Sequence, residues 1–264
     1  MKLNTDKMLA EKTEGIGWMT FNNPERRNAM SLEMWEAAET ILADFAEDPD
    51  VRVVVMKGAG DKAFVSGADI SQFEKERADA AASERYAQRS EAARKRLREL
   101  DKPVIAMIRG YCLGGGLGIA MMADLRFATE DSQFGIPAAR LSIAYTGENI
   151  ENLLRLVGPS RAKDILYSAR RLDAREALDI GLINRVVPVK DLEGTVREYC
   201  ATLVQNAPLS IRAHKIIIDQ MMKDVDVRDR EAIKAASAAC FDSEDYKEGR
   251  TAFMEKRTPV WKGR

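Results

Sequence analysis

The chain is organised around one stretch, Lys102-Pro-Val-Ile-Ala-Met-Ile-Arg-Gly-Tyr-Cys-Leu-Gly-Gly-Gly-Leu-Gly-Ile-Ala-Met-Met-Ala-Asp124. Within it, residues 104–108 form a short apolar run between a proline and a glycine, a pattern typical of a buried β-strand. Consecutive glycines follow at 114–116, and residues 119–123 have the apolar composition of a helix start. The stretch therefore predicts a strand, a glycine turn and a helix in direct succession.

The glycines at 114–116 indicate a backbone that lies close to another group. Consecutive glycines cost chain entropy and contribute no side chain to packing. Bare N–H groups at a helix N-terminus favour negative charge. We therefore predict that this turn faces an anionic group, and a tight turn without a ligand is the alternative that the local pattern leaves open.

The composition limits the classes of partner. The chain has 264 residues, of which 45% are apolar, and its formal net charge of -1 gives no basic excess for nucleic acid. No apolar run approaches the roughly 18 residues that span a bilayer, and residues 1–7 lack the apolar core of a signal peptide. The few cysteines are scattered, as in proteins of a reducing compartment. We expect a soluble, cytoplasmic protein with no nucleic-acid or membrane partner.

Several chemistries are disfavoured by the residue types that are missing. His214 is the only histidine and the cysteines are not clustered, so we expect no metal site. The chain has no G-x-S-x-G elbow and no phosphate-binding P-loop. The glycines at 114–118 do not complete a dinucleotide-binding fingerprint.

The order of the elements predicts an α/β protein with a helical end. A β-hairpin is expected over residues 8–21, a helix over 31–47 with Ser31 as its N-cap, and a β-branched strand over 51–56. Strands and helices alternate to about residue 190, and only helical patterns follow. We therefore predict a core over residues 1–194 and a helical assembly region over 195–264.

Separate sequence words along the chain point to a family. Besides the central stretch, they are Asn22-Asn-Pro-Glu-Arg-Arg-Asn-Ala-Met30, Phe64-Val-Ser-Gly-Ala-Asp-Ile70, Phe134-Gly-Ile-Pro137, Gly181-Leu-Ile-Asn-Arg-Val-Val187 and Glu244-Asp-Tyr-Lys-Glu-Gly-Arg-Thr-Ala-Phe-Met-Glu-Lys-Arg257. In this order they make the chain resemble the crotonase, or enoyl-CoA hydratase/isomerase, superfamily over essentially its whole length. The resemblance depends on the number and order of these words. A single glycine cluster would not be enough to indicate the family.

The resemblance implies a fold, a ligand and an assembly. The fold is a crotonase-like spiral of ββα units with a C-terminal helical trimerisation region, assembled as a homotrimer or a dimer of trimers. The substrate is an acyl-coenzyme A thioester, and no cofactor is expected besides the coenzyme A that belongs to this substrate. The thioester carbonyl is expected in an oxyanion hole made by the backbone N–H groups of Ala68 and Gly115, which stabilise a developing enolate.

Further positions match the coenzyme site of the family. The residues implied in coenzyme binding, in addition to Ala68 and Gly115, are Arg27, Ala29, Asp69, Ile70, Ser71, Phe253 and Lys256. The last two are implied as contacts from a neighbouring subunit. Helix packing for Phe253 and a solvated charge for Lys256 are the alternatives.

Two departures from the family pattern concern the acid and the base. Gly118 and Ala138 stand where the resembling hydratases have glutamates that handle protons, and neither residue can transfer a proton. Tyr145 and Glu148 are the candidate replacements. The structural alternatives are a partly buried tyrosine ring with a satisfied hydroxyl, and a glutamate that interacts only with the first turn of its helix.

Three functions remain open from the sequence. The first is an acyl-CoA lyase or isomerase of fatty acid metabolism that uses the enolate hole. The second is a malonyl-type acyl-CoA decarboxylase, because residues 134–157 and the tail from Ser243 resemble the methylmalonyl-CoA decarboxylase branch. That branch has a histidine where this chain has Ala68. The third is a non-catalytic acyl-CoA-binding protein that has lost its acid and base.

Overall fold

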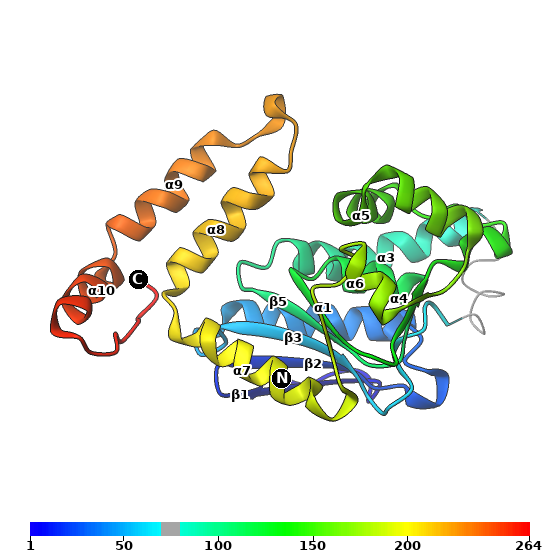
Figure 1. The fold of residues 1–264 in the computed structure, drawn as a ribbon, viewed down its shortest axis with the longest axis horizontal. Helices are drawn as coiled ribbons and strands as arrows, with labels where there is room; N and C mark the ends of the chain where they lie inside the picture. The colour runs from blue at the N-terminus through cyan, green and yellow to red at the C-terminus, as the bar shows by residue number, and fades with distance from the viewer. Residues whose placement is uncertain (70–79) are drawn as a thin grey trace.

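Two β-sheets and the helices around them form the core in the computed structural model, which describes residues 1–69 and 80–264. Figure 1 shows the core at one end and a helical arm at the other. The strands are β1 (Met8–Thr13), β2 (Ile16–Phe21), β3 (Val53–Gly58), β4 (Ala63–Val65), β5 (Val104–Ile108), β6 (Tyr111–Leu113), β7 (Leu125–Thr129), β8 (Gln133–Gly135), β9 (Leu172–Asp173) and β10 (Arg185–Val187).

Helices cover the sheets and form the C-terminal end of the chain. The α-helices are α1 (Leu32–Glu47), α3 (Ala80–Arg98), α4 (Gly115–Met121), α5 (Gly147–Ser168), α6 (Ala174–Asp179), α7 (Leu192–Gln205), α8 (Pro208–Met221), α9 (Arg230–Phe241) and α10 (Glu244–Glu255). Short 3-10 helices are η1 (Pro24–Arg26), η3 (Pro137–Leu141), η4 (Val189–Asp191) and η5 (Val225–Val227).

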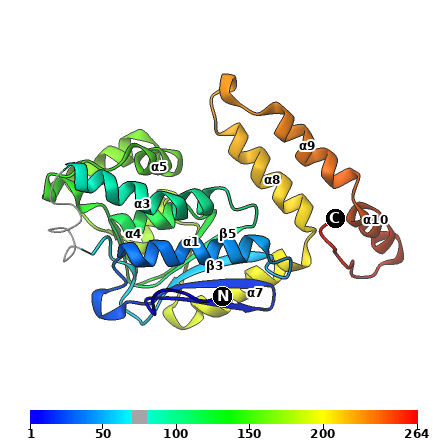
Figure 2. The same cartoon turned by 180° about the vertical axis from the view of Figure 1, so that it is seen from behind.

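The larger sheet has six strands in the order β1-β2-β3-β5-β7-β10, and its central strands β2, β3 and β5 are mostly buried on both faces. Alternate residues of one strand face opposite sides. Val54 and Met56 of β3 therefore join the core under α1 and α3, whereas Val53 and Val55 join the core under α7. Figure 2 shows α1 and α3 on one side of this sheet. A strand buried on both faces needs apolar side chains at every position, which explains its β-branched sequence.

Most predicted local elements of the N-terminal half are confirmed, although β3 lies two residues later than the strand predicted over 51–56. β1 and β2 form the expected antiparallel hairpin, with Met8 opposite Phe21, and β5 has the predicted bounds. α1 follows Ser31 as expected. Ser31 is the N-cap residue, as predicted, but its hydroxyl donates 3.4 Å to the Glu33 carboxylate instead of accepting from a backbone N–H.

The smaller sheet carries the turns that matter for function. It has four strands in the order β4-β6-β8-β9, and β4, β6 and β8 pair in parallel. Because the ends of parallel strands meet at one edge, the turn after β4 and the turn after β6 lie together. The turn after β6 enters α4 at Gly115, as the glycine pattern predicts.

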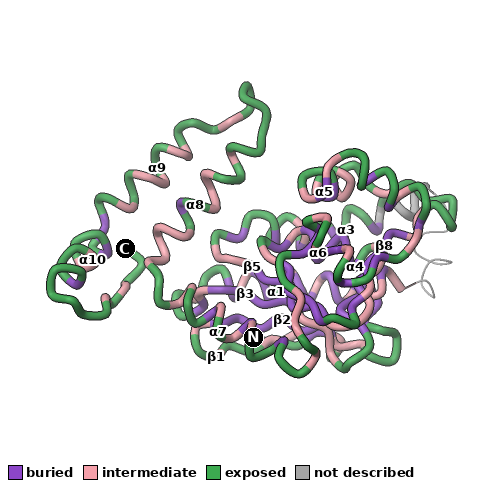
Figure 3. The backbone as a smooth tube through the Cα atoms, viewed as in Figure 1, coloured by how far each residue is buried: buried purple, intermediate pink, exposed green. Residues whose placement is uncertain are grey.

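The C-terminal helices α8, α9 and α10 extend away from the core (Figure 1). Figure 3 shows that their residues are mostly exposed or half-buried, whereas the strands and α4 are mostly buried. α7 instead packs on the sheet through Leu192, Val196 and Cys200. The predicted division between residues 194 and 195 therefore falls inside α7, and the assignment of two units remains a prediction.

Membrane-spanning helices are absent from the part of the chain that the structure describes, since none of its helices is both long and apolar enough to cross a bilayer.

Candidate active site

The loop after β4 is held in place by the segment that precedes α1. The backbone N–H of Met30 donates 2.9 Å to the carbonyl of Gly67, and the N–H of Asp69 donates 3.0 Å to the carbonyl of Met30. The N–H of Ser66 donates 3.1 Å to the carbonyl of Arg27. These bonds fix both sides of Ala68, so its amide has a defined direction.

Asn28 anchors that preceding segment. Its side chain is fully buried, and its Nδ2 donates to the carbonyls of Ala59 at 2.9 Å and Ala63 at 2.8 Å. Its Oδ1 accepts from the N–H of Asn23 at 2.9 Å. The backbone of Asn28 has φ 57°, a left-handed conformation that asparagine tolerates better than most residues. Asn28 therefore positions Arg27 and Ala29 beside the loop after β4.

The turn into α4 approaches that loop so closely that only glycine fits. A Cβ on Gly116 would lie 2.0 Å from the carbonyl oxygen of Val65, which no side chain tolerates. Gly114 has φ 52° and ψ -120°, a combination that side chains disfavour. A Cβ on Gly115 would lie 3.7 Å from the amide nitrogen of Ala68. The glycine cluster thus brings the amides of residues 68 and 115 near each other.

The N–H groups of Ala68 and Gly115 share a second property. Within residues 1–69 and 80–264, neither N–H donates a hydrogen bond to a backbone or side-chain acceptor. Most backbone N–H groups in folded proteins have a partner, so two neighbouring free donors suit an external acceptor. Both residues line the same small pocket, which leaves the donors accessible to a ligand.

This acyl pocket, as we call the space beside the two amides, has a volume of about 40 Å³. Residues of α1, α3, α4 and the start of α5 line it, together with the segment before α1 and the loop after β4. Its described lining residues are Met30, Trp35, Gly67, Ala68, Tyr86, Arg94, Gly115, Gly118, Ile119, Met122 and Asn149. None of these is an aspartate or a glutamate.

Gly118 lies in the acyl pocket opposite two polar side chains. A Cβ at this position would lie 2.9 Å from the hydroxyl oxygen of Tyr145 and 3.0 Å from Oδ1 of Asn149. Tyr145 and Asn149 therefore occupy the space that a longer side chain at residue 118 would need. Ala138, at the second departing position, lies in η3 and packs against the core.

Tyr145 is held by the turn into α4. Its hydroxyl donates 3.0 Å to the carbonyl of Gly114. Tyr145 is not among the described lining residues of the acyl pocket, although its hydroxyl lies beside Gly118, which is one of them. Burial, followed by the nearby thiol of Cys112, raises the pKa of the Tyr145 phenol above its usual value, and the charge of Arg94 opposes this. The phenol is thus neutral at physiological pH and acts as a hydrogen-bonding group rather than a base.

Glu148, the other predicted proton-handling residue, has a different environment. Its carboxylate pairs with Arg98 of α3, and Glu148 is not among the described residues that line the acyl pocket.

Sequence reasoning missed two polar residues, Asn149 and Arg94, which do line the acyl pocket. For Arg94, helical spacing was the available signal, because it precedes the buried Leu97 by three positions in α3.

The predicted coenzyme-binding residues do not all lie in one described part of the structure. Arg27 has φ 52° and its guanidinium stacks 5.3 Å from the centre of the Tyr111 ring, while Ala29 is buried nearby. Asp69 follows Ala68 directly. Ile70 and Ser71 lie outside the described residues. These assignments remain predictions.

Phe253 and Lys256 lie far from the acyl pocket of their own chain. The Phe253 side chain in α10 is 82% exposed, and Lys256 ends that helix with φ 56°. Figures 1 and 2 both show α10 at the opposite end of the molecule from α4. Any role of these residues at an acyl pocket therefore requires a second chain, and this too remains a prediction.

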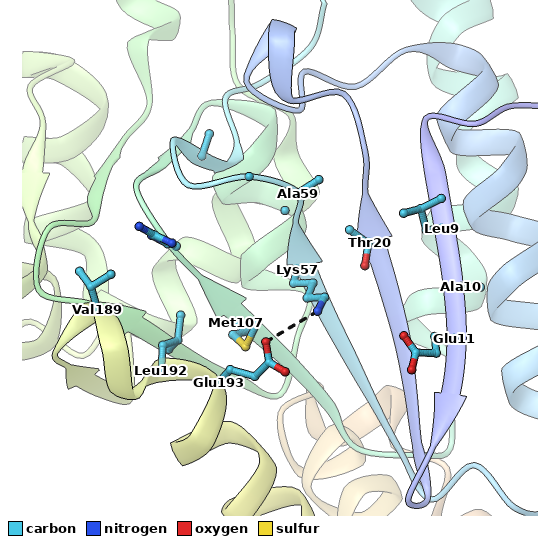
Figure 4. Close-up of a pocket in the computed structure, with 14 residues that line it drawn as sticks. Leu9, Ala10, Glu11, Thr20, Lys57, Ala59, Met107, Val189, Leu192 and Glu193 are labelled. Atoms are coloured by element: carbon cyan, nitrogen blue, oxygen red, sulfur yellow. Dashed lines mark ion pairs between the residues drawn. The ribbon is translucent and has the colours of Figure 1, made fainter.

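A larger pocket of about 640 Å³ lies between the β1–β3 strands and α7. Figure 4 shows Lys57 and Glu193 facing each other there, with an ion pair of 4.0 Å between them. Glu11 and Thr20 line its other side. Ala68 and Gly115 are not among its lining residues, so this pocket is separate from the free amides.

Several solved structures have the same fold as this chain. A crystal structure of an enoyl-CoA hydratase/carnithine racemase from Magnetospirillum magneticum superposes with a TM-score of 0.94 at 33% identity, over 99% of this chain and 97% of that chain. An enoyl-CoA hydratase from Bacillus anthracis gives a TM-score of 0.91 at 31% identity, over 98% of this chain and 100% of that chain. The predicted α/β crotonase-like fold is confirmed.

Proteins with similar sequences are also enoyl-CoA hydratases by name. A short-chain-enoyl-CoA hydratase of Clostridium acetobutylicum is 35% identical over 97% of both chains. A crotonyl-CoA hydratase of Syntrophomonas wolfei is 33% identical over 96% of both. The family model described as enoyl-CoA hydratase/isomerase matches residues 11–264. The chain therefore belongs to the enoyl-CoA hydratase/isomerase family, within the crotonase superfamily.

Proposed function

We propose that this protein is an acyl-CoA enzyme that forms a thioester enolate against the backbone amides of Ala68 and Gly115. The observation that carries the proposal is the pair of neighbouring N–H groups without an acceptor in the described part of the chain. A thioester carbonyl oxygen between them accepts two hydrogen bonds. These bonds strengthen as the oxygen gains charge, which is how such donors lower the barrier to enolate formation.

Tyr145 is the polar group that we assign to the enolate. Its hydroxyl faces Gly118 of the acyl pocket, since a Cβ on that residue would lie 2.9 Å from the hydroxyl oxygen. The hydroxyl donates to the carbonyl of Gly114 in this conformation, and it would exchange that bond for one to the enolate carbon or to a substrate oxygen. We assign Glu148 no contact with substrate in this conformation, because its carboxylate is paired with Arg98. The acyl-CoA brings the only coenzyme that this chemistry requires.

A second candidate function is decarboxylation of a malonyl-type thioester. Loss of carbon dioxide from the α-carbon leaves the C–C bonding electrons as an enolate and needs no base. The described lining of the acyl pocket has no carboxylate, which favours this reaction over hydration. It also agrees with the resemblance of residues 134–157 to the methylmalonyl-CoA decarboxylase branch. A non-catalytic acyl-CoA binder is the remaining possibility.

A panel of short acyl-CoA thioesters, followed by mass spectrometry, tests these functions. We expect conversion of at least one thioester. Tyr145→Phe should slow that conversion by about tenfold, the value of one neutral hydrogen bond. Glu148→Gln should leave it nearly unchanged.

The panel also separates the candidate functions. Release of carbon dioxide from malonyl-type thioesters supports the decarboxylase. Binding of every thioester without any conversion identifies a non-catalytic protein. A Glu148→Gln variant that loses activity while Tyr145→Phe keeps it would show that the proton-handling residue is wrongly assigned.

We further propose a homotrimer or a dimer of trimers that assembles through α8–α10. Exposed apolar side chains gather on these helices and their connections, namely Ile218, Met221, Met222, Val225, Val227, Phe241, Phe253 and Met254. A monomer rarely leaves so many on one region in contact with water. The same assembly would supply Phe253 and Lys256 to a neighbouring acyl-CoA site.

Light scattering at micromolar concentration measures this assembly. We expect a mass of three or six chains, and Ile218→Asp should shift the protein towards smaller species because its exposed side chain lies on α8. Tyr167→Asp is the matched control, since Tyr167 is exposed on α5, outside the arm. A monomeric mass for the unmodified chain would contradict the proposal.

A further inference from the structure

We infer that Arg94 binds a free carboxylate at the end of the acyl group, so that the substrate is a coenzyme A thioester of a short dicarboxylic acid whose second carboxylate stays on the molecule. The inference rests on the proposed function, because it requires the thioester carbonyl to occupy the acyl pocket. The inference adds a substrate class and a residue that determines specificity. The N–H groups of Ala68 and Gly115 alone define neither.

Arg94 differs from the other cationic residues of its helix. From residue 86 to the end of α3, Arg89 pairs with Glu36 at 2.8 Å, Arg96 pairs with Glu39 at 3.2 Å, and Lys95 lies 3.9 Å from Glu99. Arg98 pairs with Glu91 and Glu148. Arg94 forms no ion pair with any carboxylate that the structure describes. Among the residues that the structure describes, its guanidinium thus has no carboxylate partner, which makes it the candidate to bind an anion from outside the chain.

The direction of Arg94 is set by two aromatic side chains. Its guanidinium carbon lies 5.1 Å from the centre of the Trp35 ring, and such stacking holds an arginine without using its N–H donors. The indole N–H of Trp35 donates 3.1 Å to the hydroxyl of Tyr86. Both aromatic residues are nearly fully buried, so they form a rigid support.

Arg94 and the two free amides belong to one pocket. All three lie among the described lining residues, with no acidic side chain in that set. The positive charge of Arg94 also reaches Tyr145, where it opposes the rise in pKa that burial and the thiol of Cys112 cause. A half-buried guanidinium without a counter-ion is costly to desolvate, and a substrate carboxylate would relieve that cost.

The chemistry favours a carboxylate that is retained over one that is released. An ion pair with arginine stabilises a carboxylate in the bound substrate. That stabilisation disappears when the carboxylate becomes neutral carbon dioxide, so the ion pair would raise the barrier to decarboxylation. A carboxylate further along the acyl chain keeps its charge throughout enolate chemistry. Arg94 thus suits a terminal carboxylate rather than the reacting group.

The enclosed space beside the two amides is small, about 40 Å³. We therefore expect a short acyl group, of about the length of succinyl, whose terminal carboxylate meets Arg94, a half-buried residue of the pocket lining.

Isothermal titration calorimetry with succinyl-CoA and butyryl-CoA tests the inference on the full-length assembled protein. The two thioesters have acyl chains of equal carbon number and differ in a terminal carboxylate or methyl group. We expect succinyl-CoA to bind about ten- to a hundredfold more tightly, the range for a hydrogen bond to a charged group. Arg94→Gln should abolish this preference while butyryl-CoA affinity stays the same, and Arg94→Lys should retain part of it.

Arg96→Gln is the matched control, because Arg96 lies on the same helix, carries the same charge and pairs with Glu39 on the outside. It should keep the preference for succinyl-CoA. Equal affinity for the two thioesters, or a preference that survives Arg94→Gln, would overturn the inference and leave the proposed function standing. Failure of both thioesters to bind would overturn the proposed function and the inference together. Rapid release of carbon dioxide from malonyl-CoA that slows in Arg94→Gln would show that the carboxylate is consumed rather than retained.

Discussion

Hydration of crotonyl-CoA by this protein is expected to be on the order of ten-thousandfold slower than by an efficient hydratase. Each general acid or base contributes roughly a hundred- to ten-thousandfold to such reactions, and both are missing at Gly118 and Ala138. Burial raises the pKa of Tyr145, so its phenol stays protonated and cannot take a proton from water. The free amides stabilise the enolate but cannot supply the nucleophile.

Loss of crotonyl-CoA absorbance measures this rate. The Syntrophomonas wolfei relative that is named a crotonyl-CoA hydratase serves as the positive control in the same assay. Fast hydration by the unmodified chain that survives both Tyr145→Phe and Glu148→Gln would contradict the expectation. It would mean that another group in the acyl pocket activates water.

Restoring one carboxylate should not restore the reaction. A Cβ at residue 118 would lie 2.9 Å from the Tyr145 hydroxyl and 3.0 Å from Oδ1 of Asn149. Gly118→Glu alone therefore displaces these side chains or α5. We expect Gly118→Glu to lose the native activity without gaining hydration. A gain of hydration in this single variant would show that Tyr145 and Asn149 move aside easily.

Gly115→Pro is expected to reduce turnover about a hundredfold for whichever thioester the protein converts. Proline removes the N–H of residue 115, and loss of one oxyanion-hole donor costs roughly 3 kcal/mol of transition-state stabilisation. Residue 115 is the first residue of α4, a position where proline is well tolerated because its N–H has no helical partner. The loss should therefore appear in kcat/KM rather than in folding.

Gly115→Ala controls for the added carbon atoms. It keeps the N–H, and its methyl group would meet the Ala68 nitrogen at an ordinary contact distance of 3.7 Å. We expect this variant to lose much less activity than Gly115→Pro. Circular dichroism and light scattering verify the fold and assembly of both variants. A folded Gly115→Pro variant with unchanged kcat/KM would exclude the amide of residue 115 from the mechanism.

Much of the fold follows from local patterns in the sequence. The apolar run at 104–108 and the hairpin before residue 22 became strands with nearly the expected bounds, because strand formation there depends on side chains within a few positions. The glycine cluster likewise predicted a strand-to-helix turn, and the contact of Gly116 with the Val65 carbonyl explains why glycine is needed. The ordered sequence words then identified the family.

A local rule failed where a tertiary contact competed with it. Ser31 stands before α1 as an N-cap should, yet its hydroxyl bonds to Glu33, which in turn pairs with Lys7 of the N-terminal segment at 2.6 Å.

The sequence by itself determined the order of strands and helices, the family, and the two residues whose amides we assign to the thioester. These features depend on short-range periodicity and on positions that only glycine can occupy. Only the tertiary structure decided which polar side chains surround those amides. Glu148 turns to Arg98, fifty positions earlier, whereas Arg94 and Asn149 line the acyl pocket. Neighbouring residues on a helix point in different directions, so the packing of α3 against α1 and of α5 against α4 selects which of them reaches the site.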